Sequence, residues 1–252
     1  MKRKRGKMPM DLFHKIVDEI ATWSTCVRIV PHSYGEPFLN PDWLYTFKYI
    51  ADTVPLSKID LYTNGSVLDD DKLDDLLKIK NLRSVGFSVY AYYPETYERI
   101  IGLPFDTISK VDHAINRLSQ ERPDVYSFVS YTRDPYFISG IEADLFDNRW
   151  GKKSGSHPIL YNNQTPFQIK NSCTKTPCLT MFNQITVNHD GLVPICCHDG
   201  NCDVQLGDTN TTKLLDIWHG ETAKKYRNLH MAGLRSTIPL CGSCTYDLEY
   251  RG

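Results

Sequence analysis

The stretch KIDLYTNGSVLDDDKLDDLLKIKNLRSVGFSVYA (58–91) decides the fold class of this chain. Its first part, KIDLYTNG, is typical of a strand that runs into a turn at Asn64-Gly65. The part DDDKLDDLLKI (69–79) predicts a helix whose first-turn carboxylates lie at the positive end of the helix dipole. RSVGFSVYA (83–91) is typical of a second strand. This order of strand, helix and strand predicts a parallel βαβ unit.

The alternation continues on both sides of this stretch. The sequence predicts helices over 9–22, 41–53, 94–102 and 106–118, and strands over 26–31 and 125–132. We therefore predict an α/β fold with a parallel sheet. In a parallel α/β barrel, the loops at the carboxyl ends of the strands carry the ligand-binding groups. Three polar positions lie at such ends: residues 35–37, residues 63–65 and Ser88.

The last third of the chain has a different pattern. Helical periodicity fades after about residue 150 and polar turns become frequent, so we place a domain boundary between 151 and 172. Beyond it we expect a hairpin-like turn at Asp190-Gly191. A helix is expected over 213–233.

Composition limits the functions that the chain can have. The 252 residues carry a formal net charge of −1, with 41% hydrophobic and 23% charged residues, as in ordinary globular proteins. No apolar run approaches the length of a membrane span, and the basic start MKRKRGKMPM lacks the apolar segment of a signal peptide. We expect a cytoplasmic protein with no membrane and no nucleic-acid partner, and a solvated KRKRGK stretch (2–7).

Eight cysteines are unevenly distributed, since Cys26 stands alone and the other seven fall in the last third of the chain. Cys178 and Cys196 enclose seventeen residues, and Cys241 and Cys244 enclose two. Clustered cysteines in a reducing compartment favour a metal over disulfides. Four thiolates suit an iron–sulfur cluster, and the cysteine spacing alone supports a zinc site nearly as well. Disulfides or free thiols are a third interpretation.

Other cysteines and three histidines are weaker candidates. Cys197 follows Cys196 directly, and on a strand its side chain would point to the opposite face, so we interpret it as a bystander. Cys173 and Cys202 are alternatives to the four proposed ligands. Cys26 is expected to be a buried small hydrophobe. The histidines are expected to be structural or solvated: His189, His198 and His219.

Several segments follow one another in an order that a known family shares. In the first half these are RKRGKMPMDLFHKIVDEI (3–20), YGEP (34–37), LYTNG (61–65), FSVYAYYPETYERIIG (87–102) and NRWG (148–151). In the second half they are Cys178-x12-Gly191-x4-Cys196, LGDTNTTKLLDIWHG (206–220) and Cys241-x-x-Cys244. Their order resembles that of the radical SAM enzymes with a C-terminal SPASM or twitch domain.

The resemblance implies a fold and two sites. It implies an incomplete (β/α)6 partial barrel over 1–155, a linker over 156–172 and a cysteine-rich SPASM/twitch domain over 173–252. S-Adenosyl-L-methionine (SAM) would be bound by Gly35, Glu36, Pro37, Asn64 and Ser88, with Glu36 orienting the SAM amino group. An auxiliary [4Fe–4S] cluster would be held by Cys178, Cys196, Cys241 and Cys244.

The chain departs from the family at its first motif. In the family a CxxxCxxC motif holds the cluster that cleaves SAM to a 5′-deoxyadenosyl radical, and this motif does not precede the first helix here. We expect an N-terminally incomplete enzyme that lacks the first barrel strand. Such a chain cannot cleave SAM alone and uses SAM only if the missing segment is supplied. One auxiliary cluster is expected, because a full SPASM domain would continue beyond Cys244 with three more cysteines.

The resemblance leaves the reaction open. It implies an oxidoreductase or maturase that acts on a small-molecule or peptide substrate and takes electrons from a donor such as flavodoxin or ferredoxin. The twitch-like spacing of the cysteines favours dehydrogenation of a small alcohol. The alternative is a non-catalytic module that binds an iron–sulfur cluster or zinc and engages a peptide or carrier partner. A third hypothesis is an inert fragment with an exposed strand edge.

Overall fold

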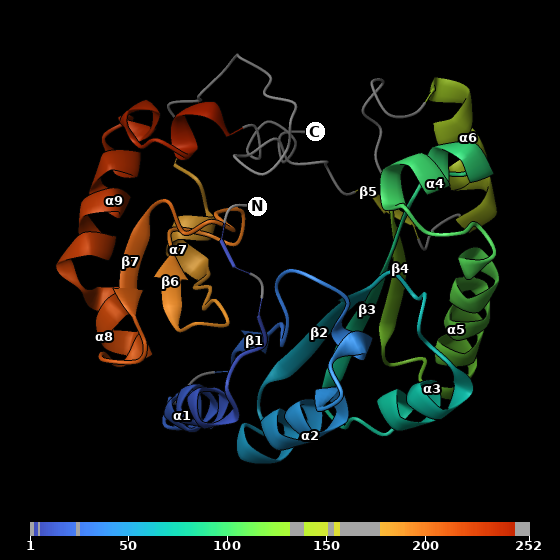
Figure 1. Ribbon diagram of the computed structural model, residues 1–252, viewed down its shortest axis with the longest axis horizontal. Helices are drawn as coiled ribbons and strands as arrows, with labels where there is room; N and C mark the ends of the chain where they lie inside the picture. The colour runs from blue at the N-terminus through green and yellow to red at the C-terminus, as the bar shows by residue number, and fades with distance from the viewer. Residues whose placement is uncertain are drawn as a thin grey trace. The chain divides into compact units, whose positions relative to one another are not determined.

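The computed structural model describes residues 3–4, 6–23, 26–131, 139–150, 154–156 and 177–244 (Figure 1). Cys173 and nearly all of the predicted boundary region lie outside these ranges. The chain divides into two compact units, Ser24–Ile159 and Met1–Trp23 with Leu160–Gly252. This grouping differs from the predicted domains, since it separates the N-terminal residues from the sheet.

The unit Ser24–Ile159 is built on a five-stranded sheet with the order β1-β2-β3-β4-β5. Its strands are β1 (Arg28–Ile29), β2 (Lys58–Thr63), β3 (Leu82–Tyr90), β4 (Tyr126–Tyr131) and β5 (Ser154–Ser156). All four pairings between neighbours are parallel. The predicted α/β fold with a parallel sheet is confirmed. The strand β1 is shorter than predicted, and β5 is not among the predicted strands.

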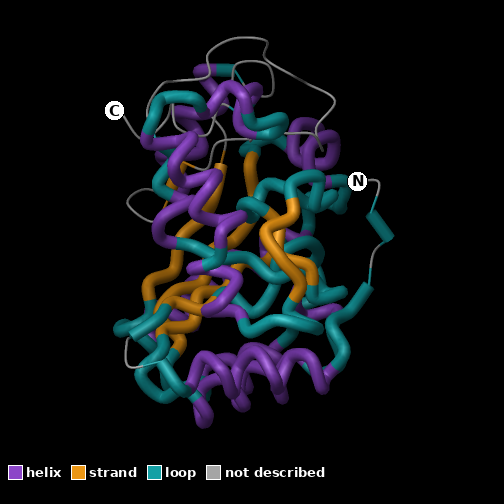
Figure 2. Tube along the Cα trace, turned by 90° about the vertical axis from the view of Figure 1, so that its left-hand side faces the viewer, coloured by secondary structure: helices purple, strands orange, loops and turns teal. Residues whose placement is uncertain are grey.

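Helices occupy the connections between the strands, which Figure 2 shows in purple and orange. They are η1 (Pro37–Leu39), α2 (Trp43–Thr53), α3 (Asp70–Leu77), α4 (Pro94–Ile101), α5 (Thr107–Glu121) and α6 (Gly140–Trp150). Asp69 caps α3 by accepting a hydrogen bond from the backbone N–H of Lys72, and Gly102 ends α4 with a φ of 74°. The helix α6 is an addition to the predicted elements.

One face of the sheet carries the apolar core of this unit. Ile59 and Leu61 of β2, Val85 and Phe87 of β3, and Val129 of β4 are fully buried. They alternate along their strands, so their side chains share one face. Helices beside the strands in Figure 1 supply further buried side chains: Phe47, Ile50, Leu73, Leu76, Ile115 and Leu118.

The opposite face of the sheet is polar and aromatic. The rings of Tyr62 and Phe128 meet edge to face over Gly86, with their centroids 5.9 Å apart. A Cβ atom at Gly86 would collide with both rings, so glycine is required at this position.

Asp60 is a buried charge in this sheet. Its carboxylate accepts hydrogen bonds from Arg28 at 2.8 Å, from Arg83 at 2.7 and 2.8 Å, and from the Ser84 hydroxyl at 2.6 Å. Burial alone would raise the pKa of Asp60, but the hydrogen bonds from Arg83, Ser84 and Arg28 lower it overall. The ionised carboxylate thus ties β1, β2 and β3 together.

The second unit contains a two-stranded antiparallel sheet, β6–β7, and short helices. Its elements are α1 (Met10–Ala21), α7 (Thr180–Asn183), β6 (Leu192–Pro194), β7 (Gln205–Asp208), α8 (Leu214–His219), α9 (Glu221–Met231), η3 (Arg235–Thr237) and η4 (Cys241–Ser243). The predicted turn before β6 is confirmed. Gly191 has a φ of 88°, and its N–H donates to the carbonyl of Asn188 at 3.0 Å.

The prediction of one helix over 213–233 is wrong, because the chain breaks at Gly220. This residue is extended, with φ −69° and ψ 162°, and stands between α8 and α9. A Cβ atom there would lie 3.0 Å from the carbonyl oxygen of Asp216. Glycine therefore permits the close approach that ends one helix and begins the next.

Helix α1 packs inside the second unit rather than on the sheet. Its apolar residues Ile16 and Ile20 contact a cluster formed by Val193, Leu214 and Ile217. Both carboxylate oxygens of Glu19 also accept hydrogen bonds from the start of α8, from the N–H groups of Leu214 at 2.9 Å and Leu215 at 2.8 Å. A side chain from another helix thus satisfies the free N–H groups of α8.

The prediction of a solvated N-terminal stretch is wrong for Arg3. Its side chain is 13% exposed, and it donates to the carbonyl of Gly200 at 3.0 Å. It also lies 3.1 Å from both the Asp190 carboxylate and His189 Nδ1. These three partners, from the turns before and after β6, outweigh the hydration of a single guanidinium, so Arg3 is anchored to the second unit.

Candidate functional site

The carboxylate of Glu36 joins the two polar segments at the carboxyl ends of β1 and β2. Its Oε1 accepts hydrogen bonds from the Thr63 hydroxyl at 2.7 Å and from the N–H of Phe38 at 3.3 Å. Its Oε2 accepts from the N–H of Asn64 at 2.8 Å. The structure therefore brings together residues 35–37 and 63–65, which the sequence places in separate loops.

Glu36 keeps room for a further donor. An ionised carboxylate offers about four lone-pair positions, and these contacts use three of them. Next to it, Gly35 has a φ of 109°, and a Cβ atom added there would meet nothing within 4 Å. Pro37 is buried at the first position of η1, which fixes the backbone beside Glu36. The arrangement fits an ammonium group lying against Gly35 and Glu36.

The turn after β2 is held by its own side chains. The Thr63 hydroxyl accepts from the N–H of Gly65 at 3.0 Å, and Asn64 Oδ1 accepts from the N–H of Ser66 at 2.9 Å. Gly65 has a φ of 75°, which glycine adopts without strain. The Asn64 side chain is thus fixed at the edge of the sheet.

Ser88 lies one strand further along the same edge. The register pairs Thr63 with Phe87 and Ser88 with Ser130, so Ser88 is level with the residue that follows Thr63. The ladder between β3 and β4 then shifts between Ser88 and Tyr90, where Tyr90 has a φ of 65°. Gly35, Glu36, Pro37, Asn64 and Ser88 all occur at this edge, as the sequence predicts for strand ends.

Two residues at this edge are absent from the sequence prediction. His32 Nε2 accepts a hydrogen bond from the N–H of Tyr62 at 2.9 Å, and burial lowers the pKa of His32 to about 4, so its ring is neutral. Burial raises the pKa of Tyr90, which a hydrogen bond with Ser88 opposes. A positive φ at a non-glycine residue beside a predicted ligand is a backbone outlier typical of functional sites, and no sequence pattern marks it.

The predicted metal ligands occur in the second unit. Cys178 is buried just before α7, Cys196 follows β6, Cys241 begins the short η4, and Cys244 follows it. The seven described cysteines form no disulfide. Cys241 and Cys196 pack in one apolar cluster with Met181, Ile195, Val204, Ile238 and Leu240.

These thiols raise the pKa values of their neighbours. Burial raises the pKa of Cys196 well above its usual value, and the neighbouring Cys197, Cys241 and Cys244 raise it further. Burial likewise raises the pKa of Cys197, and Cys178 and Cys244 add to this effect. Several thiols around one apolar cluster form a donor set suited to an iron–sulfur cluster. Among the residues that the structure describes, no three His, Cys, Asp or Glu side chains lie at the spacing of a single metal ion.

The prediction that Cys196 and Cys197 lie on a strand is wrong. The strand β6 ends at Pro194, and Cys196 and Cys197 lie in a turn closed by a hydrogen bond from the N–H of Asp199 to the carbonyl of Cys196 at 3.1 Å. The alternation of a strand therefore does not apply. Cys197 Sγ lies 3.5 Å from Nε2 of the adjacent His198.

Two buried polar residues position this turn and the first cysteine. The Asp199 carboxylate accepts from the N–H groups of Asp203 and Val204, both at 2.9 Å. His230 Nδ1 accepts from the N–H of Cys178 at 3.1 Å. The sequence prediction did not include either residue, because their partners are set by folding and not by spacing.

The remaining sequence candidates have other surroundings. Cys26 is exposed, so the prediction that it is buried is wrong; its thiol donates to the carbonyl of Leu56 at 2.9 Å at the entry to β1. Cys202 has a φ of 58°, and burial and then Asp199 raise its pKa to about 11. His219 is exposed in the last turn of α8, as predicted.

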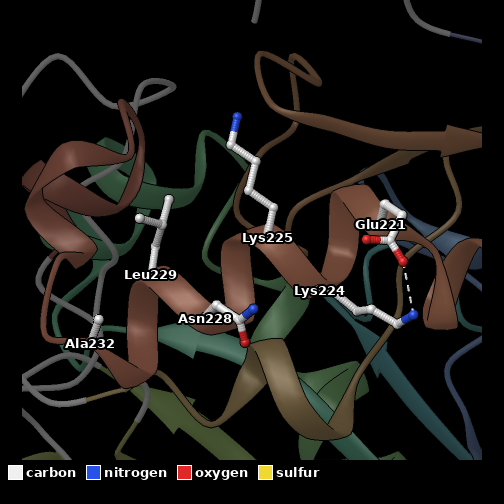
Figure 3. Close-up of a pocket in the computed structure, with 6 residues that line it drawn as sticks. All are labelled: Glu221, Lys224, Lys225, Asn228, Leu229 and Ala232. Carbon is white, nitrogen blue, oxygen red and sulfur yellow. Dashed lines mark hydrogen bonds and ion pairs between the residues drawn. The ribbon is translucent and has the colours of Figure 1, made fainter.

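A shallow depression lies along α9 (Figure 3). It is lined by Glu221, Lys224, Lys225, Asn228, Leu229 and Ala232. Five of them come from α9 and Ala232 is its C-cap, and Lys224 pairs with Glu221 at 2.9 Å. A surface made by a single helix face encloses no ligand, so we assign it no role.

Comparison with known proteins decides the family. Residues 1–132 match the radical SAM superfamily, and residues 178–245 match SPASM, an iron–sulfur cluster-binding domain. The chain belongs to the radical SAM superfamily. The resemblance inferred from the motifs is thereby confirmed, and with it the cofactor types of the family, SAM and [4Fe–4S] clusters.

Three relatives show how far this likeness extends. The SAM-dependent 2-deoxy-scyllo-inosamine dehydrogenase of Niallia circulans is 21% identical over 246 residues, covering 96% of this chain and 82% of that protein. The crystal structure of BtrN in complex with AdoMet and 2-DOIA matches with a TM-score of 0.65 at 17% identity, covering 96% of this radical SAM chain and 82% of that one. The structure of anSMEcpe with bound AdoMet matches with a TM-score of 0.68 at 14% identity. The match covers 90% of this chain and 73% of that one.

No helix in the described part of the chain is long and apolar enough to cross a membrane.

Proposed function

We propose that this chain provides the SAM-binding edge and one auxiliary [4Fe–4S] cluster of a radical SAM oxidoreductase. The bond between Glu36 and Asn64 carries the proposal, because it joins two separate polar loops at the end of a parallel sheet where ligands bind. Family membership supports the choice of SAM. The likeness to a dehydrogenase over most of both chains supports oxidoreduction.

The residues at the edge bind and orient SAM. Glu36 accepts a charge-assisted hydrogen bond from the SAM amino group at its unused lone pair. Gly35 lets the backbone approach the same group, since no side chain fills the space above it. Asn64, directly after the end of β2, and Ser88 on β3 supply polar contacts to the rest of SAM.

The cysteines hold the auxiliary cluster in an apolar pocket. Cys178, Cys196, Cys241 and Cys244 supply four thiolates, one for each iron, so no iron stays open for a further ligand. Once a one-electron donor cleaves SAM at the family's CxxxCxxC cluster, which this sequence does not carry before its first helix, SAM would supply the acceptor of a substrate hydrogen atom, and the auxiliary cluster would supply a one-electron acceptor. Oxidation of a CH–OH group releases one hydrogen atom, one electron and one proton, which matches these two acceptors. Flavodoxin or ferredoxin is the expected electron carrier.

SAM binding tests the proposal without requiring turnover. Isothermal titration of the cluster-loaded protein with SAM in the absence of oxygen should give saturable binding that S-adenosylhomocysteine weakens by competition. A small polyol should then increase SAM affinity more than an unstructured peptide does. Absence of SAM binding would remove the SAM part of the proposal. A peptide effect alone would favour a maturase over an alcohol oxidoreductase.

A further inference from the structure

His230 on α9 makes a contact that assigns its ring proton. Its side chain is fully buried, and Nδ1 accepts a hydrogen bond from the backbone N–H of Cys178 at 3.1 Å. A nitrogen that accepts carries no proton, so in the neutral ring the proton sits on Nε2.

The protonated Nε2 atom has no hydrogen-bond acceptor among the residues that the structure describes. It is also hidden from solvent. Buried N–H groups in native proteins are almost always paired, because leaving one unpaired is destabilising. The orientation of the ring is fixed by Cys178, so rotation cannot bring Nε2 to a different partner without losing that bond.

The surroundings of His230 indicate what the missing acceptor is. Its neighbours on α9, Tyr226 and Leu229, pack against the apolar cluster that contains Cys196 and Cys241. His230 itself contacts the backbone of Cys178. Three of the four proposed ligands therefore lie around this part of α9. The sulfur atoms of an iron–sulfur cluster accept hydrogen bonds, and such bonds tune the reduction potential.

We propose that His230 is a positioning residue for the auxiliary cluster, with Nδ1 holding the backbone of Cys178 and Nε2–H donating a hydrogen bond to a cluster sulfur. The inference rests on the proposed function, since it requires a cluster at these cysteines. It deepens that function by naming the group that sets the potential at which the cluster accepts an electron. An N–H donor stabilises the more negative, reduced cluster, so it raises the potential.

Two substitutions separate the two roles of the ring. His230→Asn keeps an acceptor near the position of Nδ1 and removes the donor at Nε2. His230→Gln places an amide near the position of Nε2 and removes the acceptor for Cys178. We expect the Asn variant to bind the cluster but to be reduced with an equilibrium constant about tenfold lower, about 59 mV for one electron. The Gln variant should keep a potential closer to wild type and lose cluster more readily.

The readouts are iron and sulfide content and the midpoint potential, measured by redox titration followed by electron paramagnetic resonance. His219→Asn, at the exposed end of α8, is the matched control and should change neither. A cluster-loaded Asn variant with the wild-type potential would overturn the inference about His230 and leave the proposed function intact. A wild-type protein that binds no iron would overturn both.

A measurement on the unsubstituted residue covers the case in which the variants fail to fold. Protein labelled with ¹⁵N-histidine should show coupling of a histidine nitrogen to the reduced cluster in pulsed electron paramagnetic resonance. The coupling should persist in labelled His198→Asn, which removes the histidine beside Cys197. Coupling that is absent, or that disappears with His198, would contradict the role of His230.

Discussion

The Oε2 atom of Glu36 accepts a hydrogen bond from the backbone N–H of Asn64 at 2.8 Å, which makes one site out of two loops that are 28 residues apart. The carboxylate also holds the Thr63 hydroxyl. Because the group is anchored by the protein, it presents a fixed charge to a ligand amino group and needs no rearrangement on binding.

Glu36→Gln should weaken SAM binding. The amide keeps one oxygen for Thr63 or Asn64 but removes the negative charge that faces the SAM amino group. Hydrogen bonds to charged groups contribute about 1.5–3 kcal/mol, so we expect a loss of about 10- to 100-fold in affinity by isothermal titration. Glu95→Gln, at an exposed position in the first turn of α4, is the control and should bind SAM normally. Equal affinities for wild type and Glu36→Gln would contradict the assignment.

Gly35→Ala should also weaken SAM binding, since its Cβ atom would enter the open space above the backbone. The substitution carries a second effect, because a φ of 109° strains any other residue. Gly102→Ala separates the two, as Gly102 has a φ of 74° and equally open surroundings away from the edge. Both variants should lose about 1 kcal/mol of stability, and only Gly35→Ala should lose SAM affinity.

Cys241→Ser should lose the auxiliary cluster, because a serine hydroxyl is a poor ligand for iron and Cys241 is one of four proposed thiolates. Cys197→Ser should keep about four irons per chain if Cys196 is the ligand in the turn. Cys26→Ser is the control for cluster loss during purification, because Cys26 is exposed and lies in the other unit. Anaerobic iron and sulfide analysis distinguishes them. Retention in Cys241→Ser together with loss in Cys197→Ser would reassign the ligand set.

Asp60→Asn should destabilise the sheet and flatten its acid dependence. The pKa of Asp60 is lowered on folding, so its stabilisation is complete above the unfolded value of about 3.9 and is lost as the pH falls through the folded value. Because both arginines are partly exposed, we expect a loss of only about 2 kcal/mol at pH 7. Urea unfolding at pH 7 and pH 3 measures both effects.

The control for Asp60 is Asp124→Asn, which removes an exposed partner of Arg122. It should leave the unfolding midpoint nearly unchanged at both pH values. A loss of stability between pH 7 and pH 3 that is equal in wild type and Asp60→Asn would show that another carboxylate carries the acid dependence.

Glu19→Ala should destabilise the cysteine-bearing unit by about 1 kcal/mol, as expected for removal of a helix cap. The carboxylate satisfies two N–H groups of α8, which α8 cannot satisfy itself. Glu19→Gln keeps one acceptor and should lose less. Thermal unfolding of the iron-free protein gives the comparison. An unchanged midpoint in Glu19→Ala would argue against the packing of α1 on α8.

Sequence patterns predict the regular elements of the sheet well. The strand over 58–65, the helix over 69–79 and the strand over 83–91 correspond to β2, α3 and β3 within two residues at each end. Their hydrophobic periodicity and capping residues are local, so neighbours along the chain contain the signal. The break at Gly220 is also local, but glycine alone does not distinguish a tolerated helical residue from a stop.

The partners of the site residues could not be predicted in this way. His230 and Cys178 are 52 residues apart, and Arg3 and Gly200 are 197 apart, so no window of sequence relates them. The sequence predicts the helix over 9–22, but its pattern does not state which surface the apolar residues of α1 cover. Cys197 shows the same limit, because its orientation depends on where β6 ends.

Metal analysis of protein purified without oxygen tests the central claim most directly. We expect about four irons and four sulfides per chain, with visible absorption from an iron–sulfur cluster and no stoichiometric zinc. One zinc per chain and no iron would contradict it and favour a tetrahedral thiolate site instead.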